Sequence, residues 1–409
     1  MNAFLRRVFG FKAGEERALV ASFLCFFFLM FGYYLLRPFR DALGLGRGTE
    51  KLPWYFTATF GGICVAVPIY SALAARFPRH RLIAIAYRFF AANLVLFWAG
   101  FALGAQSLLA PVFFVWVSVY NLFVVSLFWS FMADVWSTVD AKRLFGAVAA
   151  GGSAGAILGP TVTALLAKPI GPPQLLLISA VTLEISVQCA RRLGAPPSKA
   201  VGGGILAGFI NVARSPYLLG IGAQILCFAV TSTVLYTQQA AYVAQAFPDT
   251  AARTTLFARL DVAINVTALA IQLFLTGRFM RAAGLTAALA LLPLLTMAGF
   301  LVMGAVPSVI LLVGLQALRR ALHFAVDRPA REVLFTLVPR EDKYKAKSFL
   351  DTFVYRGADV VGIWAYTGIA SFGTSLGATS LWAAPIAAVW LAVAITVGRG
   401  AEKKGALPA

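Results

Sequence analysis

The sequence predicts an all-α polytopic membrane protein with twelve transmembrane helices. Of its 409 residues, 60% are hydrophobic and only 12% are charged. The mean hydropathy of +0.82 lies well above the range of soluble globular proteins. Apolar runs of about 20 residues, the length that crosses the hydrocarbon core of a bilayer, recur along the whole chain. Such runs must be helical in lipid, because only a helix satisfies its own backbone polar groups there.

The first of these runs begins near residue 16 and ends in charged residues, with no small-residue cleavage site after it. It is therefore expected to remain as a helix and not to be removed as a signal peptide. The predicted spans are residues 16–37, 53–75, 82–103, 108–134, 144–167, 173–190, 215–246, 252–277, 284–305, 307–331, 345–370 and 377–398.

The formal net charge of +19 is concentrated in alternate connections between the spans. By the positive-inside rule this pattern places both termini in the cytoplasm. No soluble domain is predicted that could present a basic face to nucleic acid. The Ala- and Arg-rich composition without a transit peptide favours a bacterial inner membrane. The basic groups are Arg6, Arg7 and Lys12; Arg76, Arg79 and Arg81; Lys142 and Arg143; Arg191 and Arg192; Arg278 and Arg281; residues 340–347; and Arg399, Lys403 and Lys404.

Enzymatic chemistry finds little support in the sequence. There is no Ser-His-Asp set, P-loop or zinc motif, and two histidines are too few for a histidine-based metal site. We expect no cofactor, no metal and a monomer. Four cysteines lie inside apolar runs and are interpreted as buried thiols: Cys25, Cys64, Cys189 and Cys227.

The glycines of "AAGGSAGAILG" (149–159) are interpreted as packing residues. Gly151, Gly155 and Gly159 have the small-xxx-small spacing that lets membrane helices approach closely. The segment lacks the Lys-Ser/Thr ending of a phosphate-binding loop.

The stretch "RLGAPPSKAVGGG" (192–204) has the composition of a linker and lies near the middle of the chain. It predicts an N-terminal six-helix half (1–192), a cytoplasmic linker (193–206) and a C-terminal six-helix half (207–409). The loop sequence "ARFPRHR" (75–81) recurs as "GRFMRAA" (277–283) after the second span of each half. Two six-helix halves related in this way are the organisation of major-facilitator transporters, which hold substrate near the membrane midplane.

Ionisable side chains at membrane depth normally face a bundle interior or an aqueous cavity, because their exposure to lipid is costly. Residues Gln316, Arg320, His323 and Asp327 fall on one face of the span 307–331, with Arg319 beside them. Polar residues recur at matching helical intervals in two other spans: Asp261 in the span 252–277 and Gln238 in the span 215–246. In the span 345–370, Asp351, Tyr355 and Asp359 form a stripe next to Arg356.

Arginines at membrane depth outnumber the carboxylates that could pair with them. The set is Arg37, Arg40, Arg88, Arg259, Arg319, Arg320, Arg331 and Arg356. Unpaired guanidinium groups favour an anionic ligand, and phosphate suits their bidentate hydrogen bonding. Two alternatives remain open: Arg259 with Asp261 and Arg356 with Asp359 could be structural or gating pairs, and Arg37 could anchor a helix end at the lipid headgroups.

Several segments resemble the ATP/ADP translocases of plastids and obligate intracellular bacteria. The stretch "LLRPFRDAL" (35–43) is similar to their signature Leu-Arg-x-x-Lys-Asp, with Arg40 in place of Lys. "DAKRLFG" (140–146) is similar to their acidic-Ala-Lys-Arg sequence. "KYKAKSFLDTFVYR" (343–356) matches Lys-x-Lys-Gly-Lys-x-x-x-Asp-x-x-x-x-Arg at Lys343, Lys345, Lys347, Asp351 and Arg356, with Ala346 in place of Gly. Pro329, Arg331 and Glu332 resemble Pro-x-Lys-Glu, again with Arg for Lys.

This resemblance implies a major-facilitator-like fold and exchange of nucleoside di- and triphosphates. It also implies phosphate contacts from basic residues of the first and tenth spans. The predicted substrate-binding residues are Arg37, Arg40, Asp41, Gln238, Arg259, Asp261, Arg320, His323, Asp327, Arg331, Glu332, Lys347, Asp351 and Arg356. Arg320 and Arg331, eleven residues apart, are expected to share one helical stripe and to clamp one polyphosphate.

The leading hypothesis is therefore a transporter of phosphorylated anions that exchanges nucleotides by alternating access. A second hypothesis is a proton-coupled transporter of another organic solute, with Asp261, Asp327 or Asp351 as the protonation site. A third, from another class, is a membrane sensor or scaffold that does not transport.

Overall fold

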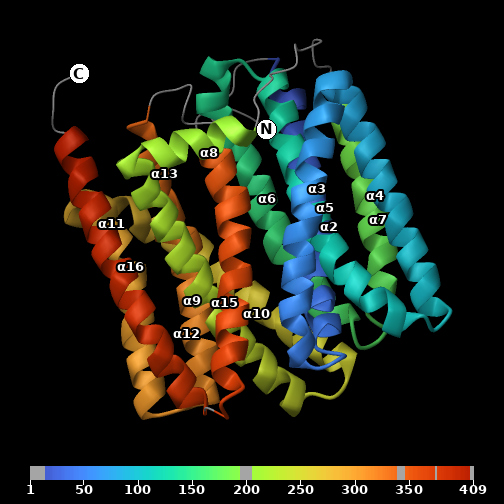
Figure 1. The fold of residues 1–409 in the computed structure, drawn as a ribbon. Coiled ribbons are helices and arrows are strands. Elements are labelled where there is room, and N and C mark those ends of the chain that lie inside the picture. The colour runs from blue at the N-terminus through green and yellow to red at the C-terminus, as the bar shows by residue number, and fades with distance from the viewer. Residues whose placement is uncertain (1–13, 194–204, 339–345, 374, 406–409) are drawn as a thin grey trace. The chain divides into compact units, whose positions relative to one another are not determined.

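The computed structural model describes residues 14–193, 205–338, 346–373 and 375–405. Each of the twelve predicted spans is helical within these residues, and no strand occurs in them (Figure 1). This confirms the predicted all-α polytopic fold. Most of the predicted linker (194–204), the basic N-terminal residues and Lys343 and Lys345 lie outside the described residues.

The helices group into two units, each with its own packed interior. The first unit contains Met1–Gly48, Gly61–Gly202 and Phe247–Asn265, and the second contains Thr49–Phe60, Gly203–Ala246 and Val266–Ala409. Two helices, α3 and α10, are therefore divided between the units. The helices of the first unit are α2 (Glu16–Gly44), α3 (Leu52–Arg76, from Gly61), α4 (Arg79–Ala102), α5 (Gln106–Val135), α6 (Thr138–Leu166), α7 (Gln174–Arg191) and the first part of α10 (Thr250–Ile271).

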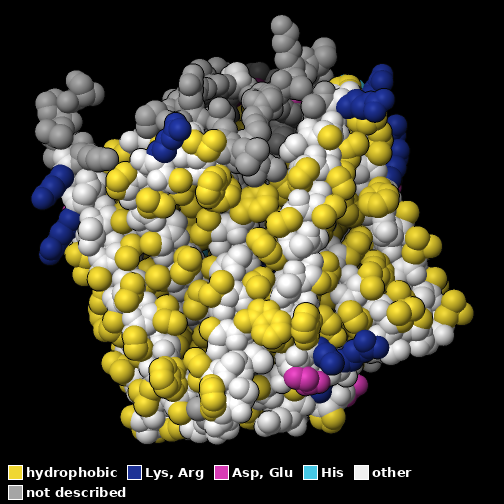
Figure 2. Space-filling model, in the orientation of Figure 1, with side chains coloured by type: hydrophobic (Ala, Val, Ile, Leu, Met, Phe, Trp, Pro, Cys, Tyr) yellow, Lys and Arg dark blue, Asp and Glu magenta, His cyan; other side chains and the backbone are white. Residues whose placement is uncertain are grey.

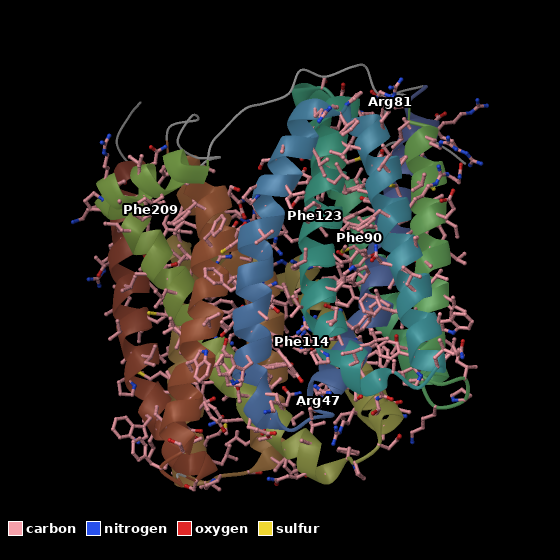
Figure 3. The ribbon with its side chains drawn as sticks, turned by 45° about the vertical axis from the view of Figure 1, so that its right-hand side comes forward. Arg47, Arg81, Phe90, Phe114, Phe123 and Phe209 are labelled. Carbon is pink, nitrogen blue, oxygen red and sulfur yellow. The ribbon has the colours of Figure 1, made fainter. Side chains whose placement is uncertain are left out.

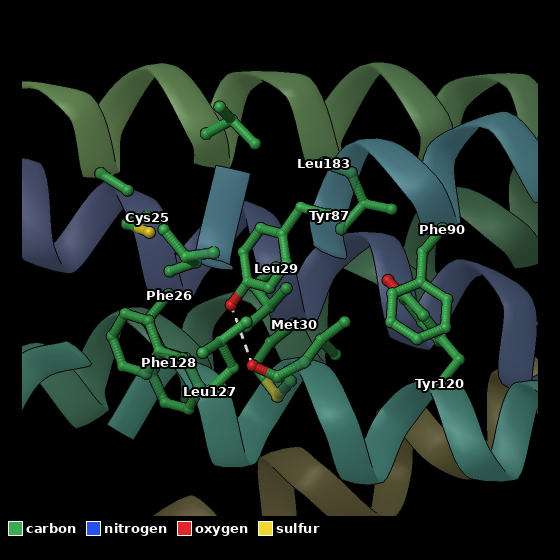
Figure 4. Packing of buried hydrophobic residues seen from close by; sticks show 14 of the residues in the cluster. Cys25, Phe26, Leu29, Met30, Tyr87, Phe90, Tyr120, Leu127, Phe128 and Leu183 are labelled. Atoms are coloured by element: carbon green, nitrogen blue, oxygen red, sulfur yellow. Dashed lines mark hydrogen bonds between the residues drawn. The ribbon is translucent and has the colours of Figure 1, made fainter. Parts of the chain in front are cut away.

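Aromatic side chains fill the core of the first unit (Figures 3 and 4). Phe26 of α2 stacks on Phe128 of α5, with ring centroids 4.4 Å apart and planes 7° apart. The buried hydroxyl of Tyr87 donates a hydrogen bond to the Val124 carbonyl at 2.9 Å, which satisfies the one polar atom of that side chain. Dense ring packing of this kind holds α2 in place, and α2 carries the charged residues considered below.

Glycines on α6 let this helix lie directly against the backbone of α2. A Cβ atom built on Gly155 would stand 2.4 Å from the Phe27 carbonyl oxygen, and one on Gly159 would stand 2.6 Å from that of Phe31. Distances below 3.0 Å are not reached by real Cβ atoms. The packing interpretation of Gly155 and Gly159 is thus confirmed, because only a residue without a side chain fits there.

Replacing Gly155 by alanine is expected to lower the thermal stability of the protein. The added methyl group meets backbone, which cannot rotate away, so α2 and α6 must separate; overpacking of this kind costs about 1–3 kcal/mol. Gly146→Ala is the matched control in the same helix, because a Cβ there meets nothing within 4 Å. Thermal unfolding of both variants in one detergent tests this, and equal melting temperatures would contradict the close-packing argument.

The second unit contains a short helix, α8, and the remaining long helices. These elements are η1 (Thr49–Lys51), α8 (Ile205–Arg214), α9 (Pro216–Ala246), the end of α10, η2 (Gln272–Thr276), α11 (Gly277–Ala305), α12 (Val309–Leu322), η3 (His323–Asp327), α13 (Arg328–Thr336), η4 (Leu350–Val354), α15 (Tyr355–Ala370) and α16 (Leu376–Gly405). The sequence did not predict α8, which runs across the direction of α9 in Figure 1. The centroid of the Phe209 ring on α8 lies 5.7 Å from the centroid of the Phe349 ring.

Within the described residues of the second unit, three π-turns interrupt the α-helices: η2, η3 and η4. A π-turn holds one additional residue and disturbs the regular i to i−4 hydrogen bonds. Side chains of η2 bond to carbonyls of η3: Gln272 Nε2 donates to the Phe324 carbonyl at 2.8 Å and Thr276 Oγ1 to the Ala325 carbonyl at 2.7 Å. These bonds satisfy backbone acceptors where water is scarce.

The surface of the described residues has the character expected of a membrane protein. Hydrophobic side chains cover most of the visible face in Figure 2, and charged side chains lie mainly toward its ends. In the first unit, Arg81 and Arg47 lie at opposite ends of the helices (Figure 3). By length and composition, nine helical stretches of the described chain could cross a membrane, and one of them, Thr250–Ala305, has 56 residues and is long enough for two crossings.

Candidate functional site

The first charged cluster belongs to α2 of the first unit. The apolar run was predicted to end at residue 37, but α2 continues through Pro38 to Gly44. Proline removes only one backbone hydrogen bond, and buried apolar neighbours hold the helix on both sides of it. Arg37, Arg40 and Asp41 therefore lie inside a helix, which argues against the helix-end anchor considered for Arg37.

Arg37 and Arg40 have different partners. The Nη1 atom of Arg37 lies 3.5 Å from Oδ1 of Asp261 on α10, and its guanidinium stands 5.7 Å from the centre of the Tyr34 ring. Arg40 lies 2.9 Å from Asp41, donates to Ser118 Oγ at 3.2 Å and stands 4.3 Å from the centre of the Phe114 ring. The ion pair of Asp41 is with Arg40, its neighbour in sequence.

The second charged cluster lies in the second unit. His323 Nδ1 is 2.9 Å from Asp327 Oδ2, and both side chains are buried. Arg331 Nη2 is 3.9 Å from Asp351 Oδ1. Further predicted residues form two more pairs there: Lys347 with Glu332, and Arg356 with Asp359 at 3.2 Å. The alternative pairing of Arg356 with Asp359 is thus confirmed, and seven predicted residues of the tenth and eleventh spans lie in such contacts: His323, Asp327, Arg331, Glu332, Lys347, Asp351 and Arg356.

The π-turn η3 changes which residues share this face. Arg319 and Arg331 are twelve residues apart and would point about 120° apart on a regular helix. One additional residue in η3 turns the following chain back by about 100°, so the two side chains nearly align. Arg319 is accordingly fully buried and Arg331 is 7% exposed, whereas Arg320 is only half-buried. The predicted common stripe of Arg320 and Arg331 is wrong, because it assumed a regular helix.

Arg319 is enclosed by neutral groups. Its guanidinium donates to Thr296 Oγ1 at 3.1 Å, to Ser232 Oγ at 2.6 Å, to Thr231 Oγ1 at 2.8 Å and to the Phe228 carbonyl at 3.0 Å. The two threonine hydroxyls donate to carbonyls of their own helices and so present lone pairs to the guanidinium.

Aromatic rings complete this enclosure. The guanidinium of Arg319 stands 4.9 Å from the centre of the Phe228 ring and 5.8 Å from that of Trp390. Phe228 also stacks on His323, with centroids 4.0 Å apart. Four of the five guanidinium hydrogens therefore have partners, and two aromatic rings lie beside the guanidinium, which indicates a role in holding helices together.

Two predicted site residues lie away from these ion pairs. Gln238 is buried and donates to Thr379 and Ser380 of α16 at 2.9 and 3.1 Å, an arrangement that joins two helices. Arg259 is exposed on α10, and the structure pairs Asp261 with Arg37 rather than with Arg259. That alternative pairing is wrong.

The excess of guanidiniums over carboxylate partners is smaller than the sequence suggested. Carboxylates on other helices pair with Arg37, Arg88 and Arg331, and carboxylates of the same helix pair with Arg40 and Arg356. The sequence of a single span does not reveal such partners, because the partner of Arg37 lies on α10 and that of Arg88 lies on α7. The paired arginines therefore differ in the distance between the guanidinium nitrogen and the carboxylate oxygen.

Arg319 is not among the predicted site residues, and neither are Ser118, Ser232 and Thr296, whose hydroxyls accept hydrogen bonds from arginines. A signal for Arg319 was present: Arg319, His323, Asp327 and Arg331 follow one another at intervals of four. On a regular helix this spacing drifts around the axis, and a π-turn is what brings it back to one face.

Comparison with known proteins gives a match of fold. No protein-family model matches the sequence, and no curated protein matches it. A bacterial homologue of the human lysosomal transporter Spinster superimposes with a TM-score of 0.64 at 14% identity, covering 98% of this chain and 100% of that one. The human organic anion transporter MFSD10 gives 0.60 at 16%, covering 95% and 100%, and the nucleoside transporter NupG gives 0.60 at 11%, covering 97% and 100%.

These neighbours are transporters of the major-facilitator type. The likeness extends over almost the whole of each chain, so this protein has the major-facilitator fold. It is a multi-pass membrane protein of that architecture.

Proposed function

We propose that this protein transports phosphorylated anions, and specifically that it exchanges nucleotides of the ATP/ADP type across a bacterial inner membrane by alternating access. The proposed phosphate contacts are Arg37 in the first unit and Arg331 in the second. The likeness of "LLRPFRDAL" and residues 343–356 to the ATP/ADP translocases supports this assignment, as does the major-facilitator fold.

The observation that carries the proposal is the length of two ion pairs. Arg37 lies 3.5 Å from Asp261 and Arg331 lies 3.9 Å from Asp351, whereas a charge-assisted hydrogen bond is about 2.7–2.9 Å long. The surface pair of Arg88 and Glu184 reaches 2.8 and 2.9 Å with both nitrogens. Arg37 and Arg331 are thus held near their carboxylates without full hydrogen bonding, and they keep donors for another acceptor.

A phosphate group could take the place of either carboxylate. Its oxygens accept bidentate hydrogen bonds from a guanidinium, and low-dielectric surroundings strengthen that attraction. Asp351 has 36% of its side chain exposed and can turn toward water when it is displaced. The carboxylate then acts as an internal substitute for the ligand, which keeps each arginine neutralised when no anion is bound.

The test is uptake of labelled ATP, ADP and inorganic phosphate into proteoliposomes, with and without nucleotide inside. Exchange predicts that internal nucleotide accelerates uptake of external nucleotide severalfold. Absence of both uptake and binding for every phosphorylated anion would contradict the proposal.

A second candidate function, proton-coupled transport, is favoured by the pair of His323 and Asp327. Both side chains are buried, and His323 Nδ1 lies 2.9 Å from Asp327 Oδ2, so a proton can be held between two titratable groups. Arg319 and Arg331 lie on the same helical face as this pair.

For this second function we expect Asp327→Asn to abolish the dependence of uptake on an imposed pH gradient while counterflow of labelled substrate persists. Uptake into proteoliposomes with and without the gradient measures this. The function is rejected if the wild-type protein ignores the gradient. Asp134→Asn, which changes a carboxylate on α5 of the first unit, serves as the control.

A further inference from the structure

An ion pair lies on the exposed face formed by α4 and α7 of the first unit. Arg88 Nε and Nη2 donate to the two carboxylate oxygens of Glu184 at 2.9 and 2.8 Å. Gln188, one turn further along α7, also donates to Glu184. The pair has near-ideal bidentate geometry, yet 45% of the Arg88 side chain and 42% of the Glu184 side chain remain exposed.

Arg88 lies within a helical stretch that can cross a membrane, His80–Ala102, and its hydrogen bonds hold Glu184 of α7 at the same depth. Arg88 is nine residues from Arg79, where α4 begins, which corresponds to about 14 Å along the helix. Glu184 is seven residues from Arg191, where α7 ends, or about 10 Å. The hydrocarbon core of a bilayer is about 30 Å thick, so groups this far from the ends of spanning helices lie inside it. Apart from Gln188, several of the exposed side chains around the pair are apolar, among them Ile85, Phe89, Leu96 and Val181.

Charged side chains inside a membrane are normally covered by protein or by water. Here the chain itself covers little more than half of each side chain, so half of an ionised pair would face lipid tails. Cover from another protein surface removes this cost, and the charges on that surface must complement those of Arg88 and Glu184.

We propose that the α4–α7 face packs against the same face of a second copy of this chain, related by a two-fold axis along the membrane normal. Such a rotation places Arg88 opposite Glu184 of the second copy and Glu184 opposite Arg88 of the second copy. The four groups then form a ring of alternating charge, in which each charge has two neighbours of opposite sign. A surface with one positive and one negative group side by side is complementary to itself in this arrangement.

The side chains around the pair suit close contact between helices. Ala92, one turn beyond Arg88 on the same face of α4, is exposed and small, and small residues allow membrane helices to approach. Phe89 and Leu96 flank it and offer apolar surface for packing. The sequence alone led us to expect a monomer, because neither the pairing of Arg88 with Glu184 nor its exposure is visible there.

A phospholipid headgroup is the competing occupant. A zwitterionic headgroup has the charges needed, but headgroups lie outside the hydrocarbon core, whereas this pair lies about 10–14 Å from the helix ends along the axis. Depth therefore favours a second copy.

The test uses two chains with different affinity tags, one carrying Arg88→Glu and the other Glu184→Arg, expressed together and purified through both tags in mild detergent. The first chain has two negative groups on the face and the second has two positive groups. We expect this mixed pair to be captured together at least about tenfold more than either variant with its own kind, because opposed like charges disfavour association. The double variant R88E/E184R is expected to self-associate like the wild type.

The matched control reverses the charges of Glu15 and Arg143, which form an ion pair elsewhere in the same unit. That mixed pair should show no preference over its self-pairs. Equal capture in the Arg88 and Glu184 experiment, with a monomeric wild type, would overturn the proposal.

A second measurement does not require charge reversal. In a chain with Cys64 replaced by serine, Ala92→Cys should give cross-linked dimers in native membranes, whereas Val361→Cys, on an exposed position of α15 in the second unit, should not. No cross-linking at position 92 counts against the dimer. Native mass spectrometry of a monomer with a bound phospholipid that is lost in R88L/E184L would assign the face to lipid and would also overturn it.

Discussion

Arg331→Ala is expected to weaken binding of a nucleoside triphosphate by roughly tenfold to a hundredfold, the equivalent of one charge-assisted contact worth about 1.5–3 kcal/mol. The loss should be smaller for a diphosphate and smallest for a monophosphate, because the contact is made to the phosphate chain. Arg331→Lys should be milder, since the charge remains while the bidentate geometry is lost. Binding measured by calorimetry with the three ligands tests this order.

Asp351→Asn should change affinity in the opposite direction. If Asp351 occupies the place of the phosphate, removal of its charge frees Arg331 and should tighten nucleotide binding. The matched control for Arg331→Ala is Arg281→Ala, which also removes one positive charge, from an exposed side chain that donates to the carbonyl of Gly277 in its own helix. A purely structural Arg331 predicts a different result: equal weakening for all three ligands together with a lower melting temperature.

Arg319→Ala is expected to destabilise the protein by about 3–5 kcal/mol, because it leaves a large cavity and removes the donor for four oxygen atoms, of which only Ser232 Oγ is part-buried. Arg319→Lys should recover little of this loss, since one ammonium cannot reach acceptors on α9 and α11 that are matched to a planar fork. Thermal unfolding without ligand measures the effect.

A second measurement separates this role from ligand binding. Arg319→Met keeps much of the volume and should lie between alanine and the wild type in stability. Once corrected for the fraction of folded protein, nucleotide affinity of the Arg319 variants should remain near that of the wild type. A variant that stays fully stable but no longer binds nucleotide would show that Arg319 contacts the ligand.

The predicted charged residues illustrate how far sequence reasoning reaches. Placing Arg37, Asp261, Arg331 and Asp351 within membrane-spanning helices requires only local hydropathy, because each span is recognised from its own composition. Pairing them requires the packing of helices that are up to about 220 residues apart in sequence, which hydropathy does not contain. Asp261 was therefore a candidate partner of the neighbouring Arg259, whereas the fold places it beside Arg37.

The second property that the sequence did not reveal is helical register, that is, which residues share one face of a helix. A single additional residue in η3 changes the partner of every side chain that follows it, and no residue type in His323–Asp327 marks such a turn. The side chains of Gln272 and Thr276, which bond to carbonyls of η3, come from a different helix. Their contribution depends on packing and appears only once the two helices are side by side.

Residue order alone was enough to establish the class of this protein: an all-α membrane protein whose twelve spans follow from apolar runs, with a glycine spacing on α6 that requires close helix packing. These features depend on composition and spacing within one segment, and the bilayer imposes them on every such segment. Three properties emerged only from the folded chain: which carboxylate neutralises each arginine, that Arg319 and not Arg320 is enclosed, and that Arg88 and Glu184 remain exposed. They depend on distances between helices and on rotation about their axes, and both are set by packing across the whole fold.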